Sequence, residues 1–170
     1  DKKIKVIESK ENLGFGKGNN RAVKEASGEF LFILNPDTEI KKPILDELID
    51  YYNSQSEIGI LAPKLKTPDG KTQASVKKLP TLMGAFKEFI LGIKNSYSQF
   101  GPDSLKPLEV EVVYGAAFLI KKDLYQKLGG FDEKYFVYYE DVDLCKRVLN
   151  LGKKVIYYPG IEVGHLVGAT

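Results

Sequence analysis

Tryptophan is absent from the 170-residue sequence, and cysteine, histidine and methionine each occur once. The lone Cys145 excludes an intramolecular disulfide and a thiolate zinc site, so a reducing compartment such as the cytoplasm is expected. Long apolar runs are missing too: the densest, residues 30–34 and 115–120, fall far short of the roughly 18 to 20 residues that cross a bilayer. No secretory signal pattern is visible either. The sequence thus predicts neither a disulfide-stapled scaffold nor a membrane span.

A strong charge of either sign is also lacking. The 25 Lys and Arg residues nearly balance the 23 Asp and Glu residues, and the net charge of +2 gives no argument for a nucleic-acid partner. What is present is an ordinary globular composition, with 43% hydrophobic and 28% charged residues. At this length we expect one domain with its own hydrophobic core.

Strand and helix patterns alternate along the chain, as is typical of α/β proteins. Residues 30–34 are apolar on both faces, as in a strand covered by helices, and further strands are predicted at residues 4–7, 58–62, 72–76, 110–114, 116–120 and 155–158. Helices are predicted at residues 21–26, 44–52, 79–93, 124–128 and 140–151. The turn signal at residues 68–70 favours a hairpin, so we expect a mixed, mainly parallel sheet flanked by helices.

The helix predicted at residues 79–93 carries a strongly apolar stripe. Large apolar residues repeat at three-to-four spacing, with Lys87 and Lys94 interleaved. We expect this stripe to cover the sheet. The alternative is an interfacial helix that approaches anionic lipid.

Two loops are candidates for ligand binding. Residues 12–20 are rich in Gly and Asn between a strand and a helix, where backbone amides can hold an anion, but they fit neither the dinucleotide nor the P-loop pattern. A flexible turn explains them equally well. The second loop is Asn35-Pro36-Asp37-Thr38, directly after the most apolar strand, where ligands gather in α/β sheets. Asp37 suits Mg²⁺ or Mn²⁺, although a simple turn with a helix cap is the alternative.

Acidic residues cluster at the start of the last predicted helix. Glu140, Asp141 and Asp143 favour the helix dipole, which accounts for some of them, and a carboxylate in a cleft can also act as a general base. The preceding tyrosines could stack on a sugar or simply pack. His165 follows the last predicted strand and has no metal-binding spacing around it.

Taken in order, these segments resemble the inverting GT-A glycosyltransferases of family 2, in particular their bacterial rhamnosyltransferase-like branch. The resemblance extends over most of the chain. The matching blocks are Asn12-Leu13-Gly14-Phe15-Gly16 with Asn19, residues 30–37 ending in Asn35-Pro36-Asp37, residues 114–120, Gly129-Gly130-Phe131-Asp132-Glu133, and residues 140–147.

The resemblance implies a GT-A-like (Rossmann-like) fold and a role for each matching residue. Asp37 would be the metal-binding acid of a variant DXD motif whose first position is Asn35, and His165 would complete a Mg²⁺ or Mn²⁺ site. Asp141 would be the catalytic base, with Glu140 on the acceptor side. The donor-binding residues would be Asn12, Gly14, Asn19, Asn35, Asp37, Gly115 and Ala116.

The implied activity is transfer of a hexosyl or deoxyhexosyl unit, with inversion, from a UDP- or dTDP-sugar to a saccharide or lipid-linked saccharide, in bacterial surface polysaccharide synthesis. We expect a single domain, residues 1–170, that lacks the family's first strand, loop, helix and strand. Pairing of two copies through exposed strand edges, and peripheral contact with the inner face of the plasma membrane, are further expectations. The alternatives are a non-catalytic fragment that serves in binding or assembly, and a nucleotidyltransferase-like enzyme.

Overall fold

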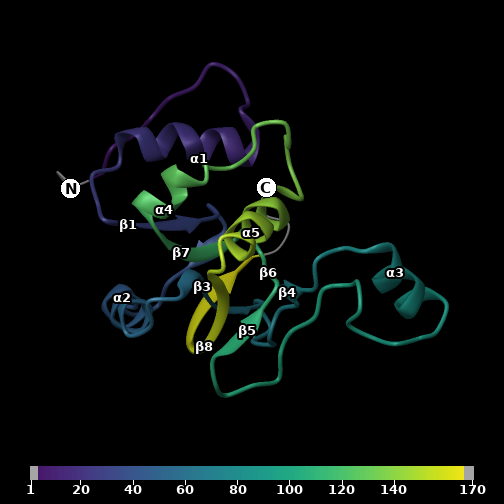
Figure 1. Cartoon of the computed structure of the whole chain (residues 1–170). Helices are drawn as coiled ribbons and strands as arrows, with labels where there is room; N and C mark the ends of the chain where they lie inside the picture. Colours follow the sequence, from purple (N-terminus) through teal and green to yellow (C-terminus); the bar gives the residue numbers. More distant parts are fainter. Residues whose placement is uncertain (1–3, 167–170) are drawn as a thin grey trace.

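A computed structural model describes residues 4–166 (Figure 1). Its helices are α1 (Gly14–Glu25), α2 (Leu45–Asn53), α3 (Leu82–Phe89), α4 (Lys122–Lys127) and α5 (Glu140–Asn150). Its strands are β1 (Phe30–Leu34), β2 (Thr38–Glu39), β3 (Ile58–Lys66), β4 (Val76–Lys77), β5 (Leu108–Val110), β6 (Val112–Val113), β7 (Ala117–Lys121) and β8 (Lys154–His165). None of the helices in this part of the chain has both the length and the apolar character to traverse a bilayer.

A mixed sheet forms the centre of the molecule. Its strands follow the order β1-β7-β3-β8-β2, with β5 paired to β8, while β4 and β6 form a separate two-stranded sheet. The sheet is mixed, as predicted, but its parallel content was overestimated, since among the described strands only β3 and β8 run parallel. The direct β7–β3 pairing, in which Leu61 lies opposite Leu119, is antiparallel and puts β7 between β1 and β3.

Two hydrophobic cores cover the two faces of this sheet. Buried residues of α1, α4 and α5 pack on one face, and buried residues of α2 pack on the other. The alternation of burial along β1 sends Leu31 and Ile33 to the first core and Phe30 and Phe32 toward the second. A run that is apolar on both faces therefore forms a strand with a helical layer on each side.

Several predicted elements have different bounds in the structure. Residues 4–7 form no strand, since no described strand pairs with them and Ile4 and Val6 are exposed. The loop predicted at residues 12–20 is mostly the first part of α1, which begins at Gly14, a residue with a φ of 70°. The hairpin after residue 70 is reduced to one bridge between Lys66 and Thr72. The last strand continues through an irregularity after Pro159, so His165 ends β8.

Helix α3 does not cover the sheet, which corrects the prediction for residues 79–93. Of its eight residues only Gly84 is buried. In Figure 1 it projects from β4 and β6, well away from the sheet. Its stripe is as apolar as that of a core helix, but the large side chains of the stripe are exposed. Periodicity reports that a helix has an apolar face and carries no information on what lies against that face.

Candidate active site

The turn after β1 brings Asn35 and Asp37 to one end of the sheet. Asn35 accepts hydrogen bonds at its carbonyl from the amide and hydroxyl of Thr38, which closes a tight turn around Pro36. Strand β2 then pairs antiparallel with β8, placing Thr38 opposite His165. The carboxylate of Asp37 consequently lies against the imidazole, with Oδ1 3.2 Å from His165 Nε2.

The Asp37–His165 pair is buried and incompletely hydrogen-bonded. The side chains are 7% and 3% exposed. Asn35 Oδ1, Asp37 Oδ1 and His165 Nε2 are all buried without a hydrogen-bond partner, because the 3.2 Å contact lacks hydrogen-bond geometry. Buried polar atoms are rarely left unpaired. Two hard oxygens and an imidazole nitrogen match the ligand preferences of Mg²⁺ and Mn²⁺, so the residues present fit a divalent cation.

Gln73 completes this part of the site, and no motif in the sequence points to it. Its Oε1 lies 2.9 Å from His165 Nδ1. A partner at Nδ1 orients the imidazole and leaves Nε2 directed at Asp37. Gln73 follows the Pro68-Asp69-Gly70 turn, and its backbone amide donates to the carbonyl of Leu65 on β3. Only the fold brings it to a histidine 92 residues away.

The second acidic group enters at the start of α5. Tyr138 and Tyr139 both have positive φ angles, 68° and 69°, which are costly for residues with a bulky side chain. This turn sends the next two side chains inward, and Glu140 and Asp141 are only 6% and 8% exposed. Asp141 accepts backbone hydrogen bonds from Gly115 at 3.1 Å and Val142 at 2.7 Å, whereas Glu140 Oε2 has no partner.

Burial shifts the pKa values of this acidic pair upward. Desolvation raises the pKa of Asp141, against hydrogen bonds from backbone amides and the charge of Lys77, which lower it. Desolvation also raises the pKa of Glu140, and the neighbouring Asp141 carboxylate adds to the shift. A carboxylate with a raised pKa is a stronger proton acceptor than an exposed one.

Three other charged residues lie near the acidic pair, and each of them contacts protein groups. Asp143 pairs with Arg147 one turn along the helix, and Arg147 also donates to the carbonyls of Leu128 and Gly130 at 2.8 Å each. Asp143 is thus neutralised, which separates it from the two buried acids. The ammonium group of Lys77 lies 4.9 Å from the centre of the Tyr139 ring, beside the acidic pair.

The segment Tyr114–Ala116 connects the two acidic groups. The amide of Gly115 donates a hydrogen bond to the carboxylate of Asp141. The carbonyl of Ala116 accepts a hydrogen bond from the amide of Asn35 at 2.9 Å. The ring of Tyr114 packs edge-on against His165, with 5.8 Å between centroids. Desolvation raises the pKa of Tyr114, and the charges of both Asp141 and Asp37 contribute to the shift. Residues 37 and 141 are therefore brought to the same end of the sheet.

The small residues Gly115 and Ala116 are buried in this segment. A methyl group at Gly115 would make ordinary contacts with the Phe15 ring and Asp141. In the structure, the backbone of Gly115 and Ala116 makes hydrogen bonds to Asp141 and Asn35. Contact of these two residues with a donor stays a prediction.

Asn12, Gly14 and Asn19 lie at the N-terminal end of α1. Asn12 accepts the amide of Gly14 at 2.9 Å, and the Asn19 side chain donates to the carbonyl of Phe15. Both asparagines therefore stabilise the start of the helix. A cavity of about 450 Å³ beside Asn12 and Gly14 is also lined by Lys5 and Arg21.

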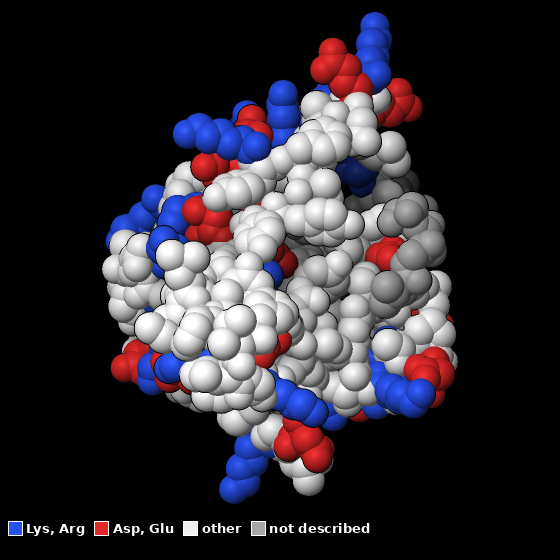
Figure 2. All heavy atoms as spheres, turned by 90° about the vertical axis from the view of Figure 1, so that its right-hand side faces the viewer, with Lys and Arg blue, Asp and Glu red and all other residues white. Residues whose placement is uncertain are grey.

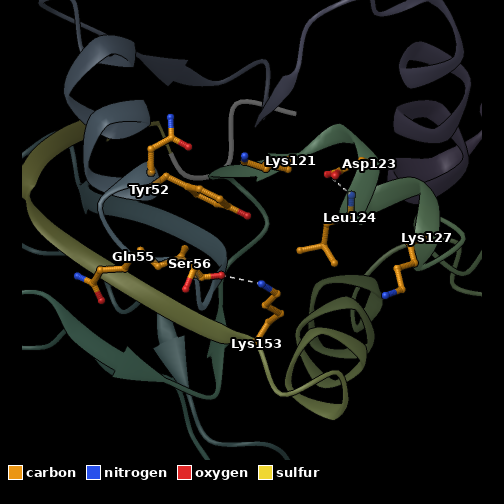
Figure 3. A pocket seen from close by; sticks show the side chains of 10 residues that line it. Tyr52, Gln55, Ser56, Lys121, Asp123, Leu124, Lys127 and Lys153 are labelled. Atoms are coloured by element: carbon orange, nitrogen blue, oxygen red, sulfur yellow. Dashed lines mark hydrogen bonds between the residues drawn. The ribbon is translucent and has the colours of Figure 1, made fainter.

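A second, larger cavity lies at the opposite end of the sheet. It measures about 520 Å³ and opens between the start of β3 and the end of β7 (Figure 3). Its lysines already have partners in part: Lys153 donates to the carbonyl of Ser56, and Lys121 pairs with Glu29. No predicted site residue lines it, and the candidate active site therefore stays at Asp37 and Asp141, near which buried polar atoms lack partners.

The geometry so far defines an α/β domain with two buried acidic groups at one end of a mixed sheet. Solved structures share this fold. The crystal structure of GalNAc-T7 with UDP, GalNAc and Mn²⁺ covers 95% of this chain, at a TM-score of 0.69 and 15% identity. The crystal structure of S. aureus TarS covers 92% of this chain and 25% of its own, at a TM-score of 0.55 and 17% identity. The predicted GT-A-like α/β fold is confirmed.

Sequence comparison gives the family. Residues 1–129 match Glycosyl transferase family 2, and residues 92–168 match the family described as N-terminal domain of galactosyltransferase. The chain belongs to glycosyl transferase family 2, as the resemblance predicted.

Curated relatives include bacterial rhamnosyltransferases. The N-acetylglucosaminyl-diphospho-decaprenol L-rhamnosyltransferase of Mycobacterium tuberculosis is 29% identical over 95% of this chain and 58% of its own length. Rhamnosyltransferase WbbL of Escherichia coli K12 is 29% identical over 89% of this chain and 60% of its own length. The chain thus spans about 58 to 60% of these two relatives.

Proposed function

We propose that this chain carries the catalytic centre of an inverting glycosyltransferase for bacterial cell-surface polysaccharide. The enzyme transfers a hexosyl or deoxyhexosyl unit from a nucleotide-sugar to an acceptor hydroxyl. The observation that carries the proposal is the meeting of Asp37–His165 and Glu140–Asp141 on the Tyr114–Ala116 segment. Family membership and the rhamnosyltransferase relatives support it.

Asp141 serves as the general base in this proposal. It takes the proton of the acceptor hydroxyl while that oxygen bonds to the anomeric carbon, and the electron pair of the broken bond leaves with the diphosphate. The raised pKa of the buried carboxylate supports this role. Glu140, whose Oε2 is buried without a partner, orients the acceptor.

Asp37 and His165 would hold Mg²⁺ or Mn²⁺, with Asn35 beside them. A divalent cation there stabilises the charge that develops on the leaving diphosphate. Within residues 4–166 no set of three His, Cys, Asp or Glu side chains is arranged as a metal site. Gln73 would keep the imidazole of His165 oriented toward such a cation.

We further propose the donor and acceptor classes. The donor is a UDP- or dTDP-sugar, contacted by Asn12, Gly14 and Asn19 near α1 and by Gly115 and Ala116. Arg21, which lines the cavity beside α1, supports a diphosphate ligand there, whereas Lys5 in the same lining already pairs with Glu25. The acceptor is a saccharide or lipid-linked saccharide, in line with the decaprenol-linked substrate in the name of one relative.

A homodimer and a location at the cytoplasmic face of the membrane complete the proposal. Strand β1 is an edge of the main sheet, with β7 as its paired neighbour. An open edge with apolar residues is a template for another strand. Sedimentation velocity over a range of protein concentrations tests pairing of two copies, and a monomer at every concentration would contradict it.

Calorimetry tests the proposed site. UDP, dTDP and GDP are titrated with and without Mn²⁺ into this chain and into a chain extended at its N-terminus. We expect metal-dependent binding, which Asp37→Ala weakens. Asp46→Ala is the matched control, since Asp46 is an exposed acid in the first turn of α2.

Two results would contradict the proposal. Equal nucleotide affinity with and without metal would reject the role of Asp37. Metal-dependent binding without transfer by the extended chain would favour the alternative of a binding or assembly protein.

A further inference from the structure

The segment of residues 78–98, here the α3 arm, exposes a continuous apolar surface. Four large residues of α3 and the residue that follows the helix lie on one side at helical spacing, and two more large residues follow in the next turn. The exposed set is Leu82, Met83, Phe86, Phe89, Ile90, Leu91 and Ile93, each 49% exposed or more. Clustered exposure on this scale marks an interaction surface, whereas single exposed residues are ordinary.

The arm is folded, so this exposure is a property of a defined structure. Thr81 caps α3 by accepting the amide of Gly84 at 2.9 Å. The carboxylate of Glu88 accepts the amides of Ser96, Tyr97 and Ser98 at 2.7 to 3.2 Å. A methyl group at Gly84 would lie 2.6 Å from the Ser96 carbonyl oxygen, so the loop packs closely on this side of the helix. The small and acidic side of α3 faces its own loop, which leaves the apolar side outward.

The charge of the arm complements an anionic surface. It contains three lysines, Lys78, Lys87 and Lys94, and a single acid, Glu88. All three lysines are exposed, and within residues 4–166 none of them forms an ion pair. Glu88 is occupied by the loop amides. Figure 2 views the molecule from the side on which α3 projects, and uncharged residues cover much of the middle of this face, with basic and acidic residues around it.

The arm also adjoins the acceptor side of the proposed site. Phe89 packs edge-on against Tyr97, with 5.7 Å between ring centroids. Lys77, the residue directly before the arm, has its ammonium group 4.9 Å from the centre of the Tyr139 ring. Tyr139 immediately precedes the buried Glu140, so the base of the arm lies beside the acidic pair.

We propose that the α3 arm docks on the surface of an anionic phospholipid bilayer, with its apolar side in the headgroup region and its lysines on the lipid phosphates. Eight residues of helix are about 12 Å long, so the helix lies on the bilayer and does not cross it. The proposal rests on the proposed function in one respect, that docking brings the acidic pair to a lipid-linked acceptor.

Vesicle co-sedimentation of the full chain tests the docking. Vesicles of phosphatidylglycerol and phosphatidylcholine are compared with pure phosphatidylcholine, at low and high salt. We expect binding to the anionic vesicles that weakens with salt. Each of Lys78→Gln, Lys87→Gln and Lys94→Gln should lower the partition coefficient about fivefold. The double variant Phe86→Asp/Phe89→Asp should lower it at least about tenfold.

Leu45→Asp is the matched control, because Leu45 is 44% exposed at the start of α2, on the other side of the molecule in Figure 1. It should bind vesicles like wild type. Absence of binding to the anionic vesicles, or equal loss in the control, would overturn the proposal. So would a dimer in sedimentation velocity that Phe86→Asp/Phe89→Asp dissociates, since the surface would then belong to a second copy.

The lysine variants keep the test valid if the double variant fails to fold, which circular dichroism reports. Nucleotide calorimetry without vesicles separates the two proposals. If the arm variants still bind nucleotide, weaker vesicle binding by these variants is an effect on docking alone. If the wild-type chain binds no nucleotide, that result contradicts the proposed function and leaves the docking proposal standing.

Discussion

The end of the sheet that carries the candidate site and the α3 arm differ in which side chains are buried and which are exposed. At the sheet end, charged groups are buried and several polar atoms lack partners, as at Asp37 and Glu140. On the arm, large apolar groups are exposed and the one acid is fully engaged by backbone amides. Each region departs from the usual distribution of residues between core and surface. Such departures are costly for an isolated domain, and this cost is the physical reason for proposing a ligand at each region.

The largest difference should be seen in turnover. In a full-length enzyme, Asp141→Asn should lower kcat about 10²- to 10⁴-fold, the contribution of a positioned general base, and leave donor binding unchanged. Phe89→Ala on the arm should leave kcat toward a soluble acceptor unchanged. Steady-state kinetics and calorimetry check both. Unchanged turnover of Asp141→Asn would remove Asp141 from the mechanism.

The pH dependence of kcat/KM also tests the proposed role of Asp141 as the general base. The base must be ionised, and burial raises its pKa above the ordinary value of 3.8. Activity should therefore fall on acidification from a higher pH than an exposed aspartate would give. A pH–rate profile with its acid limb at or below 3.8 would contradict this assignment.

The next largest effect is on the free energy of unfolding, where the packed core and the α3 arm should differ. Phe131 is 1% exposed and contacts the rings of Phe15, Phe118 and Tyr125, so Phe131→Ala should lower the free energy of unfolding by about 3 to 5 kcal/mol. Leu82 is 93% exposed, and Leu82→Ala should change it by less than about 0.5 kcal/mol. Denaturant unfolding measures both. A large loss in Leu82→Ala would mean that the arm is packed against something in the free protein.

The strained turn before α5 predicts a gain of stability. Tyr138 has a φ of 68° and an exposed side chain, so Tyr138→Gly should remove strain and raise the free energy of unfolding by about 1 kcal/mol. Tyr135→Gly is the control, since Tyr135 has no positive φ and glycine should destabilise there. A loss of stability in Tyr138→Gly would show that its ring contributes packing that outweighs the strain.

The smallest effect concerns the arm alone. Hydrogen bonds from Ser98, Tyr97 and Ser96 lower the pKa of Glu88 from 4.5 to about 2. Because this pKa is depressed in the folded state, the stabilisation is present above pH 4.5 and is lost as the pH falls toward 2. The amide resonances of residues 96–98 should therefore titrate near pH 2 in NMR spectra. Glu88→Gln should abolish that titration, and a midpoint near 4.5 would contradict the observed hydrogen bonds.

Much of the fold could be predicted because local patterns were strong. The stripe of residues 44–52, the doubly apolar run 30–34 and the acid-headed helix from residue 140 all became the elements expected. Strand directions could not be predicted in the same way, since antiparallel pairing of β7 with both β1 and β3 depends on which chain segments meet. The final strand was predicted at residues 155–158, and β8 instead runs from Lys154 to His165 through an irregularity.

The resemblance indicated Asp37, Asp141 and His165, and the fold places these three residues at the same end of the sheet, while their roles stay a prediction. Gln73 and Lys77 have no local motif, and their parts follow only from positions fixed by long-range contacts. Exposure of the α3 stripe was likewise invisible, because amphipathic spacing is the same in a covered helix and an uncovered one.

The single cysteine offers a practical consequence. Cys145 lies one turn beyond Asp141 on α5, is 1% exposed, and has its pKa raised by burial to about 12. A thiol in this state reacts with alkylating reagents only when the helix opens. The rate at which Cys145 is labelled therefore measures how often α5 opens locally. Slower labelling after nucleotide is added would show that the ligand makes this helix more rigid, and no probe has to be introduced.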